Sequence, residues 1–292
     1  MNNITPRLHH VLPTEADVAA YREHGFWLSG IVLPPEILGA AERGMKRFYA
    51  GERDRPGPPG LEGDGWRPEN GDVLRKNDYA SLRVDELSAL VAYPAIGAIA
   101  ARLSGATGIR LWHDQLLFKP AGAPDRSANV GWHTDRQYWQ TCSSEDMLTA
   151  WVPFHDVDER SGSITFIDSS HLWDTAGLDF FASDLERQET ALTAAGHTVV
   201  KSPAVLKRGQ VSFHHNRTIH GSGPNQSTAP RRSLAIHLQP SSNRYRHHTL
   251  PDGTAAHHRN DDLCRRGSDA APDYTDPALF PVLWPIDTAR DR

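Results

Sequence analysis

The sequence predicts a mainly β protein, an antiparallel sandwich or barrel preceded by helices. Residues 109–119 combine partial alternation with aromatic side chains, as a half-buried strand does. Further short apolar runs follow, separated by turn-rich segments, at 147–154, 163–167, 198–200, 210–214 and 233–238. The chain contains neither a GxGxxG nor a GxxxxGK[ST] motif, and the many short strands argue against a parallel βαβ fold.

The first hundred residues are expected to be mainly helical. Thr14, followed by two acidic residues, predicts the start of a helix that ends at Gly25. The pair Pro34-Pro35 suits the first turn of a second helix, whose apolar residues recur at spacings of three and four. A third helix is expected over residues 94–103, with Gly105 as its stop.

The length of 292 residues is compatible with one domain, because cores split only beyond roughly 250 residues. We expect a single domain over residues 1–292 in three parts. These are a helical part at about 1–107, a β core at about 108–240 and a C-terminal extension at about 241–292. The stretch 51–65 is crowded with Gly, Pro and charged residues, which predicts a loop.

Composition restricts the partners. The 31 Lys and Arg are scattered among 36 Asp and Glu, giving a net charge of −5, so nucleic acid is not expected. The uncharged stretch 87–101 is too short to cross a bilayer and contains Pro94. Residues 1–7 carry no apolar leader and the chain has only 2 cysteines, so we expect a cytoplasmic protein acting on a small molecule. The 16 histidines prompt a search for metal-ligand spacing.

The sharpest motif is His133-Thr134-Asp135. Residues i and i+2 of a strand project from the same face, about 7 Å apart, so an imidazole and a carboxylate can turn onto one cation. They would supply two ligands of the 2-His-1-carboxylate facial triad, which leaves three positions open on Fe(II). By itself this motif is weak, because His-x-Asp is frequent by chance.

A later segment supplies what the motif lacks. His220, expected to end a strand that starts after Gly209, offers a third ligand from a distant part of the chain. An arginine just beyond it can bind a carboxylate through two hydrogen bonds. Iron enzymes that use 2-oxoglutarate need such an anchor for the distal carboxylate of that keto acid.

Strand alternation distinguishes the two adjacent arginines of this segment. Arg232 shares its face with the apolar residues Leu234, Ile236 and Leu238. Arg231 shares the opposite face with the small or polar residues Ser233, Ala235 and His237, as a ligand pocket requires. Arg231 is therefore the expected anchor.

His133-x-Asp135, the HGSGPN segment that starts at His220, and Arg231-x-Ser233 together resemble the phytanoyl-CoA dioxygenase family of Fe(II)- and 2-oxoglutarate-dependent oxygenases. This family includes ectoine hydroxylase and many bacterial natural-product hydroxylases. Residues 21–35 and 151–163 are similar to its opening helix and strand and to its central strand pair, so the likeness spans most of the chain. The resemblance implies a double-stranded β-helix, a cupin-like jelly roll, with flanking helices.

The resemblance also implies roles for individual residues. It implies Fe(II) held by His133, Asp135 and His220, with 2-oxoglutarate and O₂ as co-substrates. Arg231 stands at the 2-oxoglutarate arginine, and the other positions of that pocket are Ser222, Trp151, Gln115 and Ser233. No catalytic residue is expected beyond the metal centre.

Trp139 matches a position that often faces substrate in the family, and Arg136 beside it suggests a pocket for a small polar metabolite. Two departures from the family pattern are present. Residues 168–171 read DSSH where the family has Pro-Gly-Ser-His, and Thr134 replaces a glutamine of some relatives. Neither departure removes a metal ligand.

The expected activity is hydroxylation, or another oxidation, of an unactivated C–H bond of a small metabolite, in bacterial secondary metabolism. Two alternatives remain open at this point. A zinc hydrolase can use the same three ligands, although it has no need of the Arg231 anchor. A non-catalytic binding protein can use the same scaffold, although it has no need to keep all three ligands.

The remaining histidines are expected to be structural or superficial. His214 and His215 show no special spacing to the metal motif, which favours a structural role. The stretch 241–276 is expected to be coil, so adventitious metal binding is favoured over catalysis for its paired residues His247-His248 and His257-His258.

Overall fold

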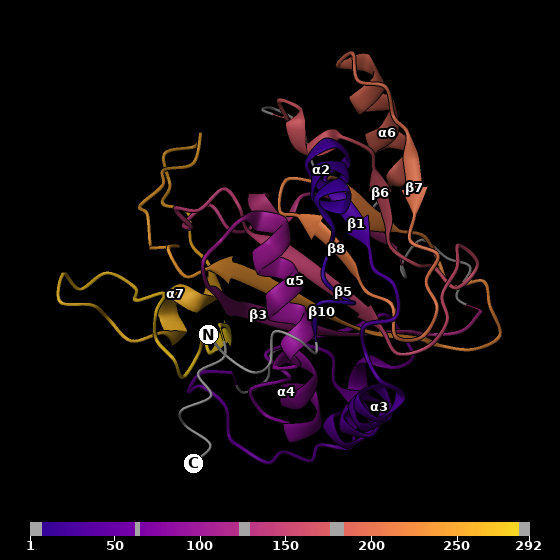
Figure 1. Ribbon diagram of the computed structural model, residues 1–292. Coiled ribbons are helices and arrows are strands. Elements are labelled where there is room, and N and C mark those ends of the chain that lie inside the picture. Colours follow the sequence, from indigo (N-terminus) through magenta and orange to yellow (C-terminus); the bar gives the residue numbers. More distant parts are fainter. Residues whose placement is uncertain (1–7, 62–64, 123–128, 176–183, 286–292) are drawn as a thin grey trace.

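Figure 1 shows a computed structural model, which describes residues 8–61, 65–122, 129–175 and 184–285. Two antiparallel sheets form its centre. The larger sheet has seven strands in the order β1-β8-β5-β10-β3-β11, with β2 also paired to β3. The smaller has four strands in the order β4-β9-β6-β7. The prediction of a mainly β double-stranded β-helix with flanking helices is confirmed.

The elements have the following bounds. The larger sheet contains β1 (Phe26–Leu28), β2 (Arg75–Asp78), β3 (Ile109–Lys119), β5 (Leu148–Pro153), β8 (Ser212–His215), β10 (Arg231–Pro240) and β11 (Val282–Trp284). The smaller contains β4 (Val130–His133), β6 (Thr165–Ile167), β7 (Lys201–Pro203) and β9 (His220–Ser222). The helices are α2 (Glu15–His24), α3 (Pro35–Tyr49), α4 (Asp85–Val91), α5 (Pro94–Ser104), α6 (Leu185–Ala194) and α7 (Arg259–Leu263).

The two faces of β10 separate the core from the site. Leu234, Ile236 and Leu238 belong to the main apolar cluster, which the helices on the outer face of the larger sheet also line. In Figure 1, α5 crosses in front of this sheet and α3 and α4 lie below it. Arg232, on the same face, lies 3.7 Å from Glu42 of α3. The opposite face of β10 therefore points between the two sheets, as alternation predicts.

The three helices predicted near the N-terminus are present, and their ends follow the expected chemistry. Thr14 caps α2 in a capping box with Asp17. Gly25 ends α2 at φ 82°, where a β-carbon would also collide with the His171 ring. Gly105 ends α5 in the left-handed conformation.

Other expectations need correction. Helix α4 and the short strands β2 and β11 were not predicted, and strands from both flanking segments complete the larger sheet. The strand expected at 198–200 forms as β7, a few residues later. His220 does not end the strand that follows Gly209, because that strand is β8 and His220 opens β9 in the other sheet. Strands of three or four residues are defined by their pairing partners, so their own sequence carries little signal.

Within the described residues, Asp85–Ser104 is long and apolar enough to cross a membrane by length and composition alone. In the structure this stretch is two helices, α4 and α5, separated just before Pro94. Leu87 and Leu90 of α4 and Ile99 of α5 are fully buried in the main core. The apolar character of the stretch is thus accounted for by core packing.

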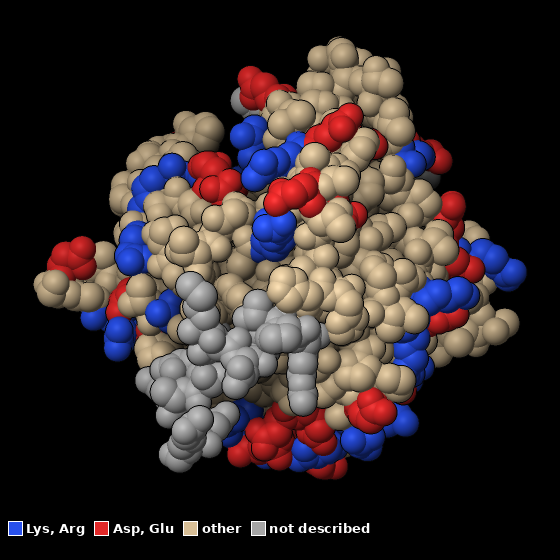
Figure 2. All heavy atoms as spheres, in the orientation of Figure 1, with Lys and Arg blue, Asp and Glu red and all other residues tan. Residues whose placement is uncertain are grey.

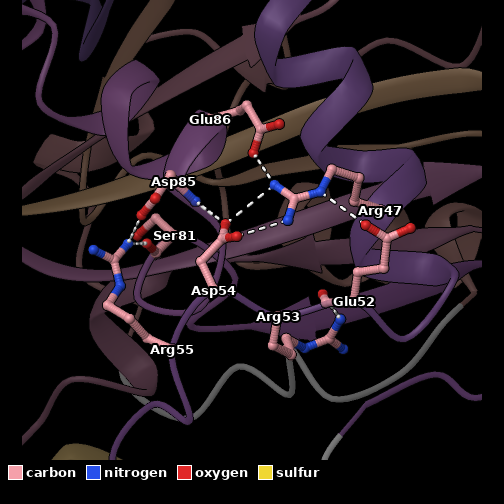
Figure 3. Close-up of polar contacts among 8 residues, drawn as sticks. All are labelled: Arg47, Glu52, Arg53, Asp54, Arg55, Ser81, Asp85 and Glu86. Carbon is pink, nitrogen blue, oxygen red and sulfur yellow. Dashed lines mark hydrogen bonds and ion pairs between the residues drawn. The ribbon is translucent and has the colours of Figure 1, made fainter.

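An ion-pair network joins α3 to α4 (Figure 3). The guanidinium of Arg47 contacts carboxylate oxygens of Glu52 at 2.9 Å, Asp54 at 2.6 Å and Glu86 at 2.7 Å. Asp54 also accepts a hydrogen bond of 2.9 Å from the backbone N–H of Asp85 at the start of α4. Figure 2 shows charged side chains of both signs along the lower edge of the molecule, beneath these helices.

Substitution of Gly97 tests how closely α5 packs on β11. A β-carbon at this position would lie 2.5 Å from the backbone oxygen of Leu283 and 3.1 Å from Cβ of Trp284. Alanine normally stabilises a helix interior by about 1 kcal/mol relative to glycine. Here we expect Gly97→Ala to lower the free energy of unfolding by about 1–3 kcal/mol, because a backbone atom must move. Urea unfolding measures this change.

Gly30 provides the matched control, since a β-carbon there would have nothing within 4 Å. Gly30→Ala is expected to leave stability within about 0.5 kcal/mol of wild type. A Gly97→Ala protein as stable as wild type would show that α5 and β11 are not in close contact.

Candidate metal and co-substrate site

The three predicted metal ligands meet between the ends of two strands. His133 ends β4, His220 begins β9, and these residues lie opposite each other in the antiparallel pair β4–β9. Their ring centroids are 4.1 Å apart. Asp135 opens the short 3-10 turn Asp135–Gln137 that follows β4. The pairing of two strands thus brings together residues that are distant in sequence.

The ligand atoms have the separations that one ion requires. Oδ1 of Asp135 lies 4.0 Å from Nε2 of His133 and 3.7 Å from Nε2 of His220. All three ligand atoms lie within 4.8 Å of one another. Bonds of about 2.0–2.2 Å from nitrogen and oxygen to a metal allow a single ion to bridge such a set after small side-chain adjustments.

Both imidazoles are oriented for metal binding by the backbone. Nδ1 of His133 lies 2.8 Å from the carbonyl oxygen of Gly131, and Nδ1 of His220 lies 2.9 Å from that of Thr218. A carbonyl oxygen only accepts, so each Nδ1 carries the proton and each Nε2 keeps its lone pair. Burial lowers the pKa of His133 to about 3 and that of His220 to about 4. Both rings are therefore neutral at pH 7.

The second oxygen of Asp135 is held by residues that the sequence did not indicate. Thr149 on β5 donates a hydrogen bond of 2.6 Å to Oδ2, and Nε2 of His214 lies 3.4 Å from the same oxygen. Burial alone would raise the pKa of Asp135, but the neighbouring His220 and His214 hold that pKa well below its usual value. His214, for which a structural role was expected, thus helps to keep this carboxylate ionised.

Two buried basic side chains lie side by side at the edge of the same cavity, and of the two Arg231 lines it. Arg231 on β10 pairs in register with Lys119 on β3, so both side chains are on one face of the larger sheet. The side chain of Arg231 donates a hydrogen bond of 2.9 Å to the carbonyl oxygen of Gly162. The Nζ of Lys119 donates one of 2.8 Å to Oγ of Ser222. No carboxylate in the described part of the chain forms an ion pair with either cation.

Their environment favours an anionic ligand. Arg231 is 2 % exposed and Lys119 is fully buried. Burial lowers the pKa of Arg231 to about 10, and burial together with nearby Arg231 lowers the pKa of Lys119 well below its usual value. Buried charges without a counter-charge are costly, so a carboxylate entering here would be strongly stabilised. The buried Nε of Arg231 and Oγ of Ser233 also lack hydrogen-bond partners.

The metal triad and Arg231 line one cavity of about 1440 Å³, whereas Lys119 lies beside Arg231 without lining it. Its lining includes the metal triad and most of the residues expected to bind co-substrate or substrate, namely Gln115, Arg136, Trp139, Trp151, Ser222 and Arg231. Ser233 lies fully buried next to this set and does not line the cavity. The residues present therefore fit a metal ion together with a small dicarboxylate.

Two of the expected residues are already engaged by the protein. The guanidinium of Arg136 donates to the backbone oxygens of Trp139 and Cys142, at 3.2 and 3.1 Å, and pairs with Glu145 at 2.9 Å. Arg136 thus holds the loop that carries Trp139. The Nε2 of Gln115 donates a hydrogen bond of 2.9 Å to Asp78 across the β2–β3 pair.

Sequence reasoning also missed Lys119 and the contribution of the tail. Lys119 lies four residues after Gln115 on the same strand, so alternation from Gln115 was the available signal. The stretch 241–276 is not simple coil. It contains α7, and several of its residues line the cavity, including His248, Leu250, Ala256, His257 and His258.

A jelly roll that brings two histidines and one aspartate to one point, beside unpaired buried cations, defines a non-haem metal-dependent oxygenase scaffold of the facial-triad type. The family model described as phytanoyl-CoA dioxygenase (PhyH) matches residues 21–233. The chain belongs to this family. The family resemblance that the sequence indicated is thereby confirmed.

Relatives and solved structures agree with this assignment. A probable alpha-ketoglutarate-dependent hypophosphite dioxygenase from Stutzerimonas stutzeri is 30 % identical over 172 residues, which cover 56 % of this chain and 56 % of that protein. The chain thus spans little more than half of that relative. The peroxisomal phytanoyl-CoA dioxygenase of Rattus norvegicus is 20 % identical over 77 % of this chain and 68 % of its own length.

Among solved structures, the non-heme alpha-ketoglutarate-dependent epimerase SnoN from nogalamycin biosynthesis has a TM-score of 0.67 and 26 % identity. The match covers 92 % of this chain and 98 % of that protein. The structure of EctD from S. alaskensis with 2-oxoglutarate and 5-hydroxyectoine has a TM-score of 0.68 at 18 % identity and covers 90 % of this chain and 88 % of that protein. The likeness to EctD shows the shared fold.

The lowered imidazole pKa values predict how metal affinity depends on pH. Only a neutral imidazole binds metal, and His133 and His220 titrate at about 3 and about 4. We expect the Fe(II) affinity to be nearly constant from pH 8 to about pH 5 and to fall as the pH approaches these values. Competition with a chelator under anaerobic conditions measures this dependence. An affinity that falls steeply below about pH 6.5 would show histidines of ordinary pKa.

Proposed function

We propose that this protein is an Fe(II)- and 2-oxoglutarate-dependent oxygenase that oxidises a C–H bond of a small organic molecule. Iron would be held by His133, Asp135 and His220. The observation that carries the proposal is that this triad lines one cavity with Arg231, which is buried beside Lys119 and has no carboxylate partner among the described residues. A hydrolytic zinc site has no use for such cations, so the arrangement favours the oxygenase.

When bound, iron and 2-oxoglutarate supply the oxidising chemistry, with O₂ consumed and succinate and CO₂ released. The chain itself orients and insulates the site. The backbone oxygens of Gly131 and Thr218 direct both histidine lone pairs inward, and Thr149 fixes the plane of the Asp135 carboxylate. Arg231 would neutralise the distal carboxylate of 2-oxoglutarate in a site from which water is largely excluded, and Lys119, bonded to Ser222 beside it, would support that charge.

We propose that further residues around Arg231 and Lys119 contact the co-substrate. Ser222, which accepts a hydrogen bond from Lys119, and Ser233, whose hydroxyl has no partner, lie next to the cations. Trp151 lies beneath the guanidinium of Arg231, with 5.4 Å between the guanidinium carbon and the ring centroid. Gln115 lines the same cavity.

The substrate is proposed to bind in the rest of the cavity, against Trp139. Arg136 contributes through the loop that it holds rather than by direct contact. The named ligands of structural relatives, 5-hydroxyectoine and a nogalamycin compound, are small molecules, which supports a small-molecule substrate in bacterial secondary metabolism. Two buried free thiols, Cys142 and Cys264, support a reducing compartment such as the cytoplasm.

Succinate formation tests the proposal. Protein supplied with Fe(II), 2-oxoglutarate and O₂ is expected to form succinate, and His133→Ala to reduce the rate by about 100-fold or more because one ligand is lost. Zinc in place of iron is expected to abolish succinate formation. Succinate production that is independent of iron and of His133, or zinc-dependent hydrolysis, would refute the oxygenase assignment.

The adjacent arginines give a matched pair for the co-substrate site. Arg231→Met is expected to weaken 2-oxoglutarate binding by about 30-fold or more, because the anchor of a buried carboxylate is removed. Arg232→Met, on the opposite face of β10, is expected to change the dissociation constant for 2-oxoglutarate by about twofold or less. Anaerobic calorimetric titration of the Fe(II)-loaded proteins measures both dissociation constants. Similar losses in the two variants would place the anchor elsewhere.

A further inference from the structure

A second part of the cavity wall is made of imidazoles that neither the metal nor the co-substrate uses. We call His113, His237 and His258 the imidazole wall. The ring centroids of His113 and His237 are 4.3 Å apart, and those of His113 and His258 are 5.3 Å apart. The ring of Trp139 lies 5.0 Å from that of His237. All four side chains line the cavity.

A chain of hydrogen bonds determines the tautomer of His237. Oγ of Thr149 lies 2.6 Å from Oδ2 of Asp135 and 2.7 Å from Nδ1 of His237. The carboxylate can only accept, so the single hydroxyl proton of Thr149 goes to Asp135. The hydroxyl oxygen must then accept a proton from Nδ1 of His237. Nε2 of His237 therefore carries a lone pair, and no described residue donates a hydrogen bond to it.

His258 has the opposite tautomer. The backbone N–H of Asn260 donates a hydrogen bond of 3.1 Å to Nδ1 of His258, so the proton of this ring is on Nε2. Asn260 is itself buried and fixed. Its amide donates a hydrogen bond of 2.9 Å to the carbonyl oxygen of Trp112, and its oxygen accepts one of 2.6 Å from Tyr79. The tail is thereby locked in a position that presents a donor to the cavity.

The imidazole wall is uncharged, in contrast to the region around Arg231 and Lys119. Burial lowers the pKa values of His113 and His258, and an imidazole of ordinary pKa is already mainly neutral at pH 7. The part of the cavity near Arg231 therefore suits a carboxylate, while His237 offers a neutral acceptor, His258 a neutral donor and Trp139 an aromatic ring. A hydroxyl group on a ring satisfies this second set, because it donates, accepts and stacks.

We propose that the imidazole wall is the substrate subsite and that it binds a neutral, hydroxyl-bearing ring, whose hydroxyl donates to Nε2 of His237. The inference deepens the proposed function, on which it rests. Nδ1 of His237 is 3.8 Å from Oδ2 of Asp135, so a group bound by this ring is held next to the metal triad.

Three probes of similar size test the subsite. Phenol carries the hydroxyl, toluene has a methyl group in its place, and benzoate has an anionic group. Dissociation constants are measured by calorimetry, without oxygen, on protein with and without Fe(II) and 2-oxoglutarate. We expect phenol to bind about fivefold more tightly than toluene, as one hydrogen bond in a buried site allows. The affinity for benzoate is expected to fall when Arg231 is replaced and to stay unchanged when His237 is replaced.

Two substitutions of one residue separate the acceptor from the rest of the ring. In His237→Asn the amide can still donate to Thr149, but the distal acceptor is gone, so the preference for phenol should disappear. In His237→Gln the amide oxygen can reach the position of Nε2, so the preference should return. His247→Asn is the control, because His247 is exposed and does not line the cavity.

Three results would overturn the inference. These are equal binding of phenol and toluene by wild type, a phenol preference that survives in His237→Asn, and a nitrogen NMR spectrum that places the His237 proton on Nε2. The test is separable from that of the proposed function, because the hydrogen-bond chain from Asp135 to His237 consists of protein atoms alone. If the protein prefers phenol but forms no succinate, the proposed oxygenase function would be refuted and the proposed hydroxyl-binding subsite would be supported.

Discussion

The ionised carboxylate of Asp135 is the constraint on which the site depends. It is 4 % exposed, and a buried charge persists only when its oxygens are satisfied. One oxygen faces the two histidines of the triad, and the other is held by Thr149, with His214 close by. The structure around the metal site is therefore organised by the needs of a single anion, and strands from both sheets contribute to it.

The region around Arg231 and Lys119 is also governed by the high cost of burying a charge without a partner. Arg231 and Lys119 come from adjacent strands and are buried with only neutral protein groups as hydrogen-bond partners. This arrangement is unfavourable until an anion arrives, so the free energy of binding a dicarboxylate is concentrated there. Arg231 and the imidazole wall line the same cavity, so the proposed co-substrate and substrate would have separate places beside the candidate metal site.

The tail shows how a segment of low apolar content becomes part of a site. Residues 241–276 contain few strand or helix signals, yet Asn260 is fully buried and bonded to Trp112 and Tyr79. Tyr274 of the same segment is also buried and donates to Asp261. These polar contacts replace a conventional apolar interface, and they set the tautomer and position of His258.

The sequence by itself predicted the candidate ligand set and the strand faces. His133, Asp135 and His220 were recognisable by residue type and spacing, and the choice of Arg231 over Arg232 followed from alternation, because both are local properties of the chain. Only the tertiary structure decided that Lys119, Thr149 and His214 complete the site and that the tail closes it. These residues are defined by contacts between segments far apart in the chain, and such contacts depend on the register and curvature of two sheets, which no local pattern specifies.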